Sequence, residues 1–196
     1  MKLCKSQENP IDILNIEISE WLCPVFKSFG LTANDITTLS LLFGVIALRF
    51  LWNYNWVAFA VTYYISYLFD CMDGHYARKY KLVSKFGDYY DHVKDISVII
   101  GLVIVVIMRY NVPKPVFYKF FVVMSVYTVL MVSHLGCQER IYPHADSPTL
   151  EFTKRFCPGD PMKTIQISKW FGCATWTVLL ISAMYYLNEN RNENRV

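Results

Sequence analysis

The sequence FDCMDGHYARKYKLVSKFGDYYDHVKD, residues 69–95, places four aspartates next to strongly apolar stretches. Because residues three or four positions apart share one face of a helix, Asp70 and Asp73 form one pair, and Asp91 and Asp95 form a second. A carboxylate near the interior of a bilayer is costly unless it binds a cation or has a functional role. The sequence therefore predicts an oxygen-lined site where two neighbouring helices face each other.

The residue types in this stretch indicate a metal and phosphate site. Carboxylate oxygens suit Mg²⁺ or Mn²⁺ rather than zinc or copper, and magnesium usually takes further ligands from a substrate phosphate. Between the acidic pairs, Gly74 and Gly87 allow a ligand to approach the backbone closely. The guanidinium of Arg78 can hold two oxygens of a diphosphate, for which lysine is a poorer fit. The implied substrate is a phosphate ester or a diphosphate.

The spacing of these residues is itself informative. They follow the pattern D-x-x-D-G-x-x-A-R, eight residues, then G-x-x-x-D-x-x-x-D, at all eight fixed positions from Asp70 to Asp95. This pattern resembles the signature of the CDP-alcohol phosphotransferases. The resemblance implies that the four aspartates bind two divalent ions, Mg²⁺ or Mn²⁺, and that Asp95 also acts as a general base. It implies CDP-binding roles for Gly74, Ala77, Arg78 and Gly87.

A second segment is similar to the same family. Residues 32–37 read T-A-N-D-I-T, which resembles the family's T-P-N-x-x-T with alanine in place of proline. The resemblance makes Asn34 and Thr37 candidate contacts of the cytidine. A plain helix cap formed by Thr32 or Asn34 explains the same residues equally well.

The composition places the chain in a membrane. Hydrophobic residues make up 54% of the 196 residues and aromatic residues 16%, which is more than soluble domains usually carry. The formal charge of +3 is too small and too dispersed for a nucleic-acid-binding surface. We expect an all-α integral membrane protein, a bundle of five to six transmembrane helices, with residues 31–187 as its membrane domain.

The expected spans are short apolar runs separated by charged or proline-containing segments. The span expected at residues 56–69 should continue as a helix through Asp70 and Asp73. Residues 136–163 are too polar to cross, so a sixth span is missing or is replaced by a short helix near residues 149–157. In that region His134, Glu139 and Arg140 belong either to a solvated loop or to an acceptor site. The spans are residues 36–52, 56–69, 96–108, 116–135 and 170–187.

The two ends of the chain are predicted to differ in structure. Asn9 and Pro10 are a helix start signal, and the apolar residues of 11–29 recur at helical spacing among charged ones. This predicts an amphipathic helix on the membrane surface within an N-terminal segment, residues 1–30, with Pro24 as a candidate break. Residues 188–196 are predicted to form a disordered polar tail.

Lysine and arginine concentrate in the N-terminal segment, in the motif loop and in residues 136–169. By the positive-inside rule, these segments and the active site are expected at the cytosolic face of an endoplasmic reticulum-type or bacterial inner membrane. We expect four lysines of the motif region to meet anionic headgroups. These are Lys79, Lys81, Lys85 and Lys94.

The six cysteines show no C-x-x-C pair and no histidine partner at zinc spacing. This spacing argues against a metal knuckle and against a disulfide framework. We therefore expect the cysteines to be small apolar residues in a reducing compartment.

The resemblance implies a reaction. A substituted phosphate passes from a CDP-alcohol to a hydroxyl group, and CMP is released. CDP-diacylglycerol is the favoured donor, and a small polyol such as inositol or glycerol 3-phosphate is the favoured acceptor. The resemblance also implies a homodimer, which is common in the family. The alternative within the family is a choline or ethanolamine phosphotransferase acting on diacylglycerol.

Three other classes of protein also carry membrane aspartates. A prenyltransferase holds a diphosphate in the same way but does not require G-x-x-A-R at this spacing. A cation transporter would use the intramembrane aspartates for metal flux without releasing CMP. A catalytically inactive family member that acts as a scaffold is disfavoured, because no residue of the pattern is lost.

Overall fold

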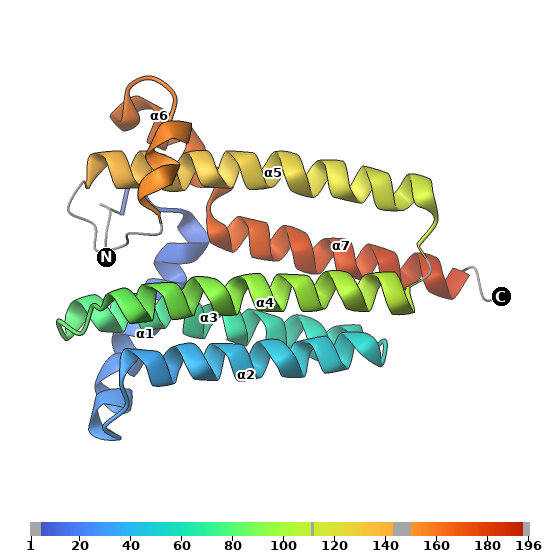
Figure 1. Ribbon diagram of the computed structural model, residues 1–196, viewed down its shortest axis with the longest axis horizontal. Coiled ribbons are helices and arrows are strands. Elements are labelled where there is room, and N and C mark those ends of the chain that lie inside the picture. The colour runs from blue at the N-terminus through green and yellow to red at the C-terminus, as the bar shows by residue number, and fades with distance from the viewer. Residues whose placement is uncertain (1–4, 111, 143–149, 194–196) are drawn as a thin grey trace.

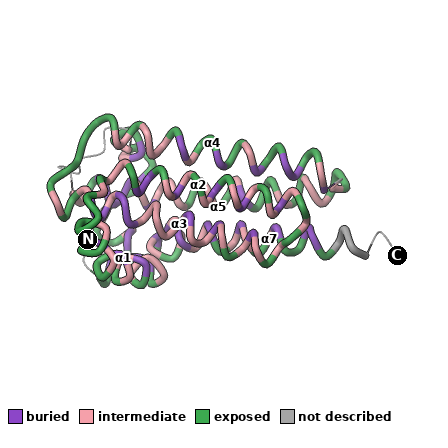
Figure 2. The backbone as a smooth tube through the Cα atoms, turned by 90° about the horizontal axis from the view of Figure 1, so that it is seen from below, coloured by how far each residue is buried: buried purple, intermediate pink, exposed green. Residues whose placement is uncertain are grey.

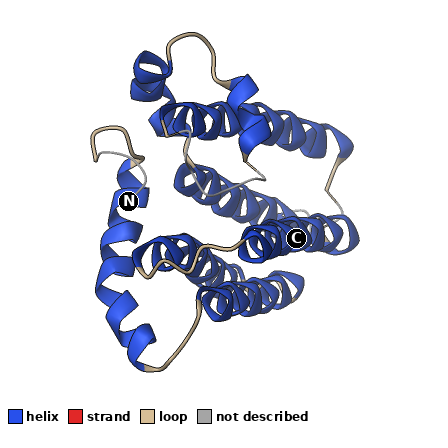
Figure 3. Cartoon of the chain, turned by 60° about the vertical axis from the view of Figure 1, so that its left-hand side comes forward, coloured by secondary structure: helices blue, strands red, loops and turns tan. Residues whose placement is uncertain are grey.

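The computed structural model describes residues 5–110, 112–142 and 150–193, and every element in them is a helix. Five long helices lie lengthwise in a bundle, and α1 lies across one end of it (Figure 1, Figure 3). The helices are α1 (Pro10–Ser28), α2 (Ala33–Trp52), α3 (Trp56–Lys79), α4 (Lys85–Arg109), α5 (Lys114–Ile141), α6 (Pro161–Ser168) and α7 (Cys173–Glu193), with 3-10 turns η1 (Glu151–Phe156) and η2 (Lys169–Phe171).

Helix α1 begins where the sequence predicts and passes through its proline. The Asn9 side chain accepts a hydrogen bond from the backbone N–H of Ile11 at 3.0 Å, and Pro10 occupies the first turn. The predicted break at Pro24 is wrong, because α1 continues to Ser28. Proline leaves the carbonyl of Glu20 without its usual helical donor, and the Lys79 ammonium donates to that carbonyl instead at 3.5 Å.

Helices α2 and α3 form a closely packed pair, and α4 packs against α2. Ser40 and Ser66 each donate a hydroxyl to the other's backbone carbonyl, at 2.9 and 2.7 Å. Gly44 lets α4 approach, since a Cβ there would lie 3.0 Å from Val98. Buried positions follow the inner faces of the helices and exposed ones the outer faces (Figure 2). This pairing brings the two halves of the aspartate motif together.

Within the described ranges, three stretches are long and apolar enough to cross a membrane: 33–52, 114–141 and 161–189. The third includes the break between α6 and α7. Helix α3 runs through Asp70 and Asp73, as predicted, and it and α4 carry too many polar residues to meet the same criterion. The part of the chain that the structure describes is all-helical, as in a helical membrane protein, and the larger number of spans stays a prediction.

The segment after α5 departs from the prediction in two ways. His134 and Glu139 do not belong to a solvated loop, because both are buried on α5, which continues to Ile141. Cys137 and Cys157 form a disulfide, so the expectation that the cysteines are unpaired is wrong for these two. Sequence spacing missed the disulfide because its cysteines are 20 residues apart and the fold alone brings them together. The predicted short helix near 149–157 is present as η1.

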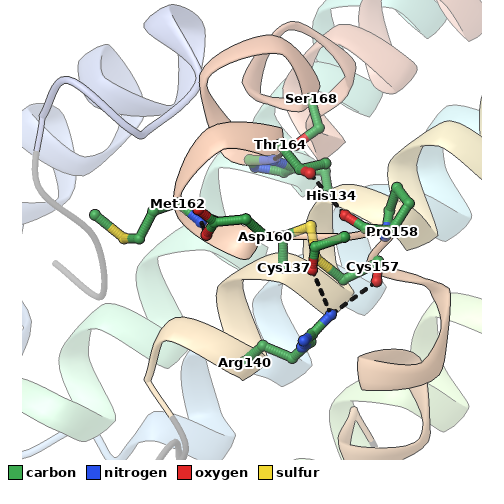
Figure 4. The surroundings of a disulfide bond; sticks show 10 residues. His134, Cys137, Arg140, Cys157, Pro158, Asp160, Met162, Thr164 and Ser168 are labelled. Atoms are coloured by element: carbon green, nitrogen blue, oxygen red, sulfur yellow. Dashed lines mark hydrogen bonds between the residues drawn. A yellow bond between two sulfur atoms is a disulfide. The ribbon is translucent and has the colours of Figure 1, made fainter.

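The disulfide joins α5 to η1, which lies directly on the helix backbone. A Cβ at Gly136 would lie 2.1 Å from the carbonyl oxygen of Thr153, so only glycine permits this approach. Arg140 donates to the carbonyls of Cys157 and Gly159, at 2.9 and 3.1 Å (Figure 4). These contacts fold the polar segment back over the end of the bundle.

The C-terminal tail differs from the prediction for residues 188–196. Helix α7 continues to Glu193, so the first part of the predicted disordered tail is helical, and residues 194–196 lie outside the described part.

Candidate metal and phosphate site

Three of the four motif aspartates converge. Asp70 lies on the second half of α3, while Asp91 and Asp95 lie on the first half of α4. Each offers a carboxylate oxygen, and these oxygens all lie within 4.8 Å of one another. The side chain of Asp95 is the most open of the three, with 47% of its surface exposed against 24% for Asp70 and 28% for Asp91. Asp95 is therefore the carboxylate most accessible to an incoming group.

Asp73 is separate from this group of three. Its side chain is buried, and its Oδ2 atom accepts a hydrogen bond from the Thr37 hydroxyl at 2.6 Å. Thr37 lies on the first turns of α2, so this contact fixes the start of α2 against the motif. This bond turns the Thr37 hydroxyl toward Asp73 on α3, and the nucleotide contact of Thr37 stays a prediction.

Lys94 lies in the middle of the three aspartates. Its Nζ atom is 3.0 Å from Oδ1 of Asp91 and 2.8 Å from Oδ1 of Asp95, and it also contacts Asp70. It donates further to the hydroxyl of Ser40 at 3.3 Å, and the residue is buried. The expectation that Lys94 meets lipid headgroups is wrong, because burial within the acidic cluster takes it away from the surface. The sequence did carry a signal for this contact, because Lys94 follows Asp91 by three residues and therefore lies on the same face of the helix.

The cluster suits a hard divalent cation. The cluster offers carboxylate oxygens from α3 and α4, and oxygen is the ligand atom that Mg²⁺ and Mn²⁺ prefer. Asp70, Asp91 and Asp95 are partly buried, and the charge on Lys94 balances only one of their three negative charges. Carboxylates that share a partly buried site favour a bound cation. The residues present therefore fit the implied metal.

A cavity of about 310 Å³ adjoins the cluster. Its charged lining residues are Asp70, Lys94 and Asp95. The other lining residues come from α2, α3, α4, α5 and α7, and they include apolar ones such as Met131 and Trp176. The charged lining residues can therefore hold a charged group while the apolar ones contact hydrocarbon.

Glycines of the motif make room for polar side chains. A Cβ at Gly74 would lie 3.3 Å from the guanidinium of Arg78, and a Cβ at Gly87 would lie 3.1 Å from Oδ1 of Asn34. The structure thus brings Asn34 on α2 next to Gly87 on α4. Ala77 lies one turn after Gly74 on α3 and is partly buried. The expected phosphate-binding residues lie on the two helices that also carry the aspartates.

The helix cap predicted for this region is formed by Thr32. The Thr32 hydroxyl accepts from the backbone N–H of Asp35 at 3.3 Å, and Asp35 accepts from the backbone N–H of Thr32 at 2.7 Å. The side chain of Asn34 is turned toward Gly87 rather than toward the start of the helix. Capping thus accounts for Thr32, and Asn34 remains available as a ligand contact.

Helix α1 supplies two acidic residues that the sequence analysis missed. Asp12 accepts a hydrogen bond from the Tyr67 hydroxyl at 2.5 Å, and burial raises the pKa of Asp12. Glu20 lies 2.5 Å from the His75 ring and pairs with Lys79, and the hydrogen bond from Lys79 lowers the pKa of Glu20. These contacts dock α1 on the part of α3 that carries the motif. They span more than 50 positions of sequence, so local spacing gave no signal for them.

Comparison with known proteins agrees with the geometry. A sequence model of the CDP-alcohol phosphatidyltransferase family matches residues 30–189. This range covers α2 through most of α7 and contains all eight positions of the motif. Neither a curated protein nor a solved structure shows a significant match to the chain. The match spans most of the sequence and includes the converging aspartates, so the chain belongs to the CDP-alcohol phosphatidyltransferase family.

Proposed function

We propose that this protein transfers a phosphatidyl group from CDP-diacylglycerol to the hydroxyl of a small polyol, such as inositol or glycerol 3-phosphate, and releases CMP. The observation that carries the proposal is the convergence of Asp70, Asp91 and Asp95 beside a cavity lined by both charged and apolar side chains. A phospholipid donor has the same division between a charged diphosphate and hydrocarbon chains. Membership of the family supports this reaction over cation transport.

The residues have distinct roles in the proposed reaction. Asp70, Asp73, Asp91 and Asp95 would hold two divalent ions, which when bound would neutralise charge on the diphosphate. Arg78 donates to the diphosphate oxygens, while Asn34, Thr37, Gly74, Ala77 and Gly87 surround the CDP group.

Proton transfer falls to Asp95. Its exposed carboxylate takes the proton of the acceptor hydroxyl, and the resulting oxygen forms a bond to the phosphorus that carries diacylglycerol. The bond from that phosphorus to the oxygen bridging to the CMP phosphate breaks, and CMP leaves with the electron pair. Each residue thereby contributes either binding, orientation or proton transfer.

The reaction is tested with purified protein, labelled CDP-diacylglycerol, and Mg²⁺ or Mn²⁺. A panel of alcohols including inositol, glycerol 3-phosphate and serine is added, and CMP and the lipid product are identified. A second set of reactions offers CDP-choline or CDP-ethanolamine with diacylglycerol. CMP release that requires a polyol and labelled CDP-diacylglycerol supports the proposal. Product formed only from CDP-choline or CDP-ethanolamine would replace it with the choline or ethanolamine reaction.

We also propose five to six spans, a surface-lying α1, a cytosolic active site and a homodimer. The excess of lysine and arginine at the motif end supports the cytosolic side. The disulfide lies at the same end of the bundle as the turn between α3 and α4 (Figure 1). Disulfides persist mainly in oxidising compartments, whereas the charge pattern places this end of the bundle at the cytosolic face. Labelling from one face of the membrane decides between the two. A cysteine at exposed Lys85 (Lys85→Cys) should react with an impermeant maleimide only from the cytosolic face.

A further inference from the structure

The ammonium of Lys94 occupies the space between the three converging carboxylates. Its Nζ atom is 2.8 Å from Oδ1 of Asp95 and 3.0 Å from Oδ1 of Asp91, and it contacts Oδ1 of Asp70 as well. Only 2% of the Lys94 side chain is exposed. The same three carboxylates each offer an oxygen within 4.8 Å of the others, and together they could hold a metal ion. The lysine therefore shares its ligands with any cation that binds there.

The arrangement has an electrostatic cause. Three carboxylates whose oxygens lie within 4.8 Å of one another repel one another, and a buried cation lowers this repulsion. The single charge of Lys94 leaves the cluster with a net formal charge of about −2, which still attracts a divalent cation. An ammonium and a divalent ion at the same oxygens repel strongly in a partly buried site, so they cannot both occupy the central position.

The cavity beside the cluster gives the Lys94 ammonium space to move. The lysine side chain is a flexible four-carbon stem with a compact charge, unlike the planar fork of arginine. Lys94 lines the cavity of about 310 Å³ beside the cluster, and the Ser40 hydroxyl, 3.3 Å from Nζ, belongs to the same cavity wall. The cavity is also lined by the hydroxyl-bearing residues Ser66, Thr128 and Thr177, so the ammonium can leave the shared oxygens and remain near polar groups.

We propose that Lys94 is a built-in counter-ion that competes with divalent cations for the oxygens of Asp70, Asp91 and Asp95, and thereby sets the cation concentration at which the site fills. This inference rests on the proposed function in that it takes cation binding by the aspartates as its starting point. Lys94 is a positioning residue in this role, acting through the carboxylates. The lysine holds the cluster together until a cation replaces it.

The experiment measures Mn²⁺ binding to the purified full-length protein by the electron paramagnetic resonance signal of free Mn²⁺. Lys94→Met removes the competing charge, and we expect its Kd for Mn²⁺ to fall at least tenfold. Lys94→Gln, which keeps a hydrogen-bond donor without the charge, should behave in the same way and serves if the methionine variant does not fold. Lys94→Arg keeps the charge and should not bind more tightly than the wild type. The matched control is Lys85→Met, an exposed lysine on the same helix, which should leave the Kd unchanged.

Thermal unfolding supplies a second readout that separates competition from a purely structural role. Without added divalent ions, Lys94→Met should have a lower Tm than the wild type, because its three carboxylates lack a counter-ion. Saturating Mn²⁺ should raise the Tm of Lys94→Met more than that of the wild type. A structural role alone would lower the Tm without tightening Mn²⁺ binding.

The outcomes distinguish the inference from the proposed function. If the wild type binds Mn²⁺ and Lys94→Met or Lys94→Gln binds it equally or more weakly, competition by Lys94 is wrong while the proposed function stands. If only the variants lacking the charge bind Mn²⁺, the inference is supported in its strongest form. If Asp91→Asn binds Mn²⁺ as well as the wild type does, the carboxylate site is elsewhere, and both proposals fail.

Discussion

At the scale of single residues, Asp91 is the strictest test of the cation site. Asp91→Asn removes the charge of a carboxylate whose Oδ1 atom is buried beside Lys94. We expect CMP release to fall to background because the cation is no longer held, as measured with labelled CDP-diacylglycerol. Asp88→Asn, on the same helix but outside the cluster, is the control and should retain most of the activity. Normal activity in Asp91→Asn would remove this residue from the site.

Asp95 is predicted to contribute differently. The side chain is the most exposed of the cluster, so Asp95→Asn should weaken Mn²⁺ binding less than Asp91→Asn does. Loss of the general base should nevertheless reduce kcat by about 10²- to 10⁴-fold. Steady-state CMP release and Mn²⁺ binding are measured on the same preparations. Loss of Mn²⁺ binding in step with kcat would make Asp95 a ligand without the proton-transfer role.

Thr37 is predicted to stabilise the start of α2 through Asp73. Thr37→Val removes the hydroxyl that donates to the buried Asp73 at 2.6 Å. A buried acceptor left without its donor costs about 1–3 kcal/mol, so thermal unfolding should occur at lower temperature. Thr37→Ser keeps the hydroxyl and should be close to the wild type. An unchanged Tm in Thr37→Val would show that Asp73 finds another donor.

At the scale of secondary-structure elements, Glu8 links the start of the chain to α5. Its Oε1 accepts from the Gln138 side chain at 3.4 Å, and burial, followed by the nearby charge of Asp12, raises the pKa of Glu8 from 4.5 to about 7. The unfolded chain releases this proton near pH 4.5 and the folded one near pH 7, so stability contributed by Glu8 falls as pH rises through that interval. The shift corresponds to about 3 kcal/mol.

The measurement is the Tm in detergent between pH 4.5 and pH 8. Glu8→Gln is neutral at every pH and keeps a similar shape, so it should lose less stability than the wild type on going to high pH. The difference between the two curves isolates Glu8 from other titrating groups. Parallel curves would show that the Glu8 carboxyl titrates normally in the folded protein.

Helical periodicity explains which elements and residues were predictable. Asp70 and Asp91 were found because spacing within one helix decides which side chains share a face, and the start of α1 because Asn9 and Pro10 act locally. The places of Asp12 and Lys94 were missed for a different reason. Each depends on contacts between helices, and a single sequence without covarying positions carries no record of which helices touch.

At the scale of the whole molecule, the disulfide is predicted to stabilise the end of the bundle that carries the motif. Closing a loop between residues 20 positions apart restricts the unfolded chain, which by loop entropy is worth about 3 kcal/mol. Adding dithiothreitol should therefore lower the Tm of the wild type and leave that of the double variant Cys137→Ser, Cys157→Ser unchanged. Equal effects of the reductant on both proteins would show that the bond contributes nothing to stability.

The covalent link between α5 and η1 also has a consequence for handling the protein. A protease that cuts the chain at any peptide bond between Cys137 and Cys157 leaves two fragments that are still joined. Such a preparation would run as one band on a denaturing gel without thiol and as two bands with it. A nicked sample would therefore pass as intact in ordinary non-reducing quality control, even though its backbone is severed.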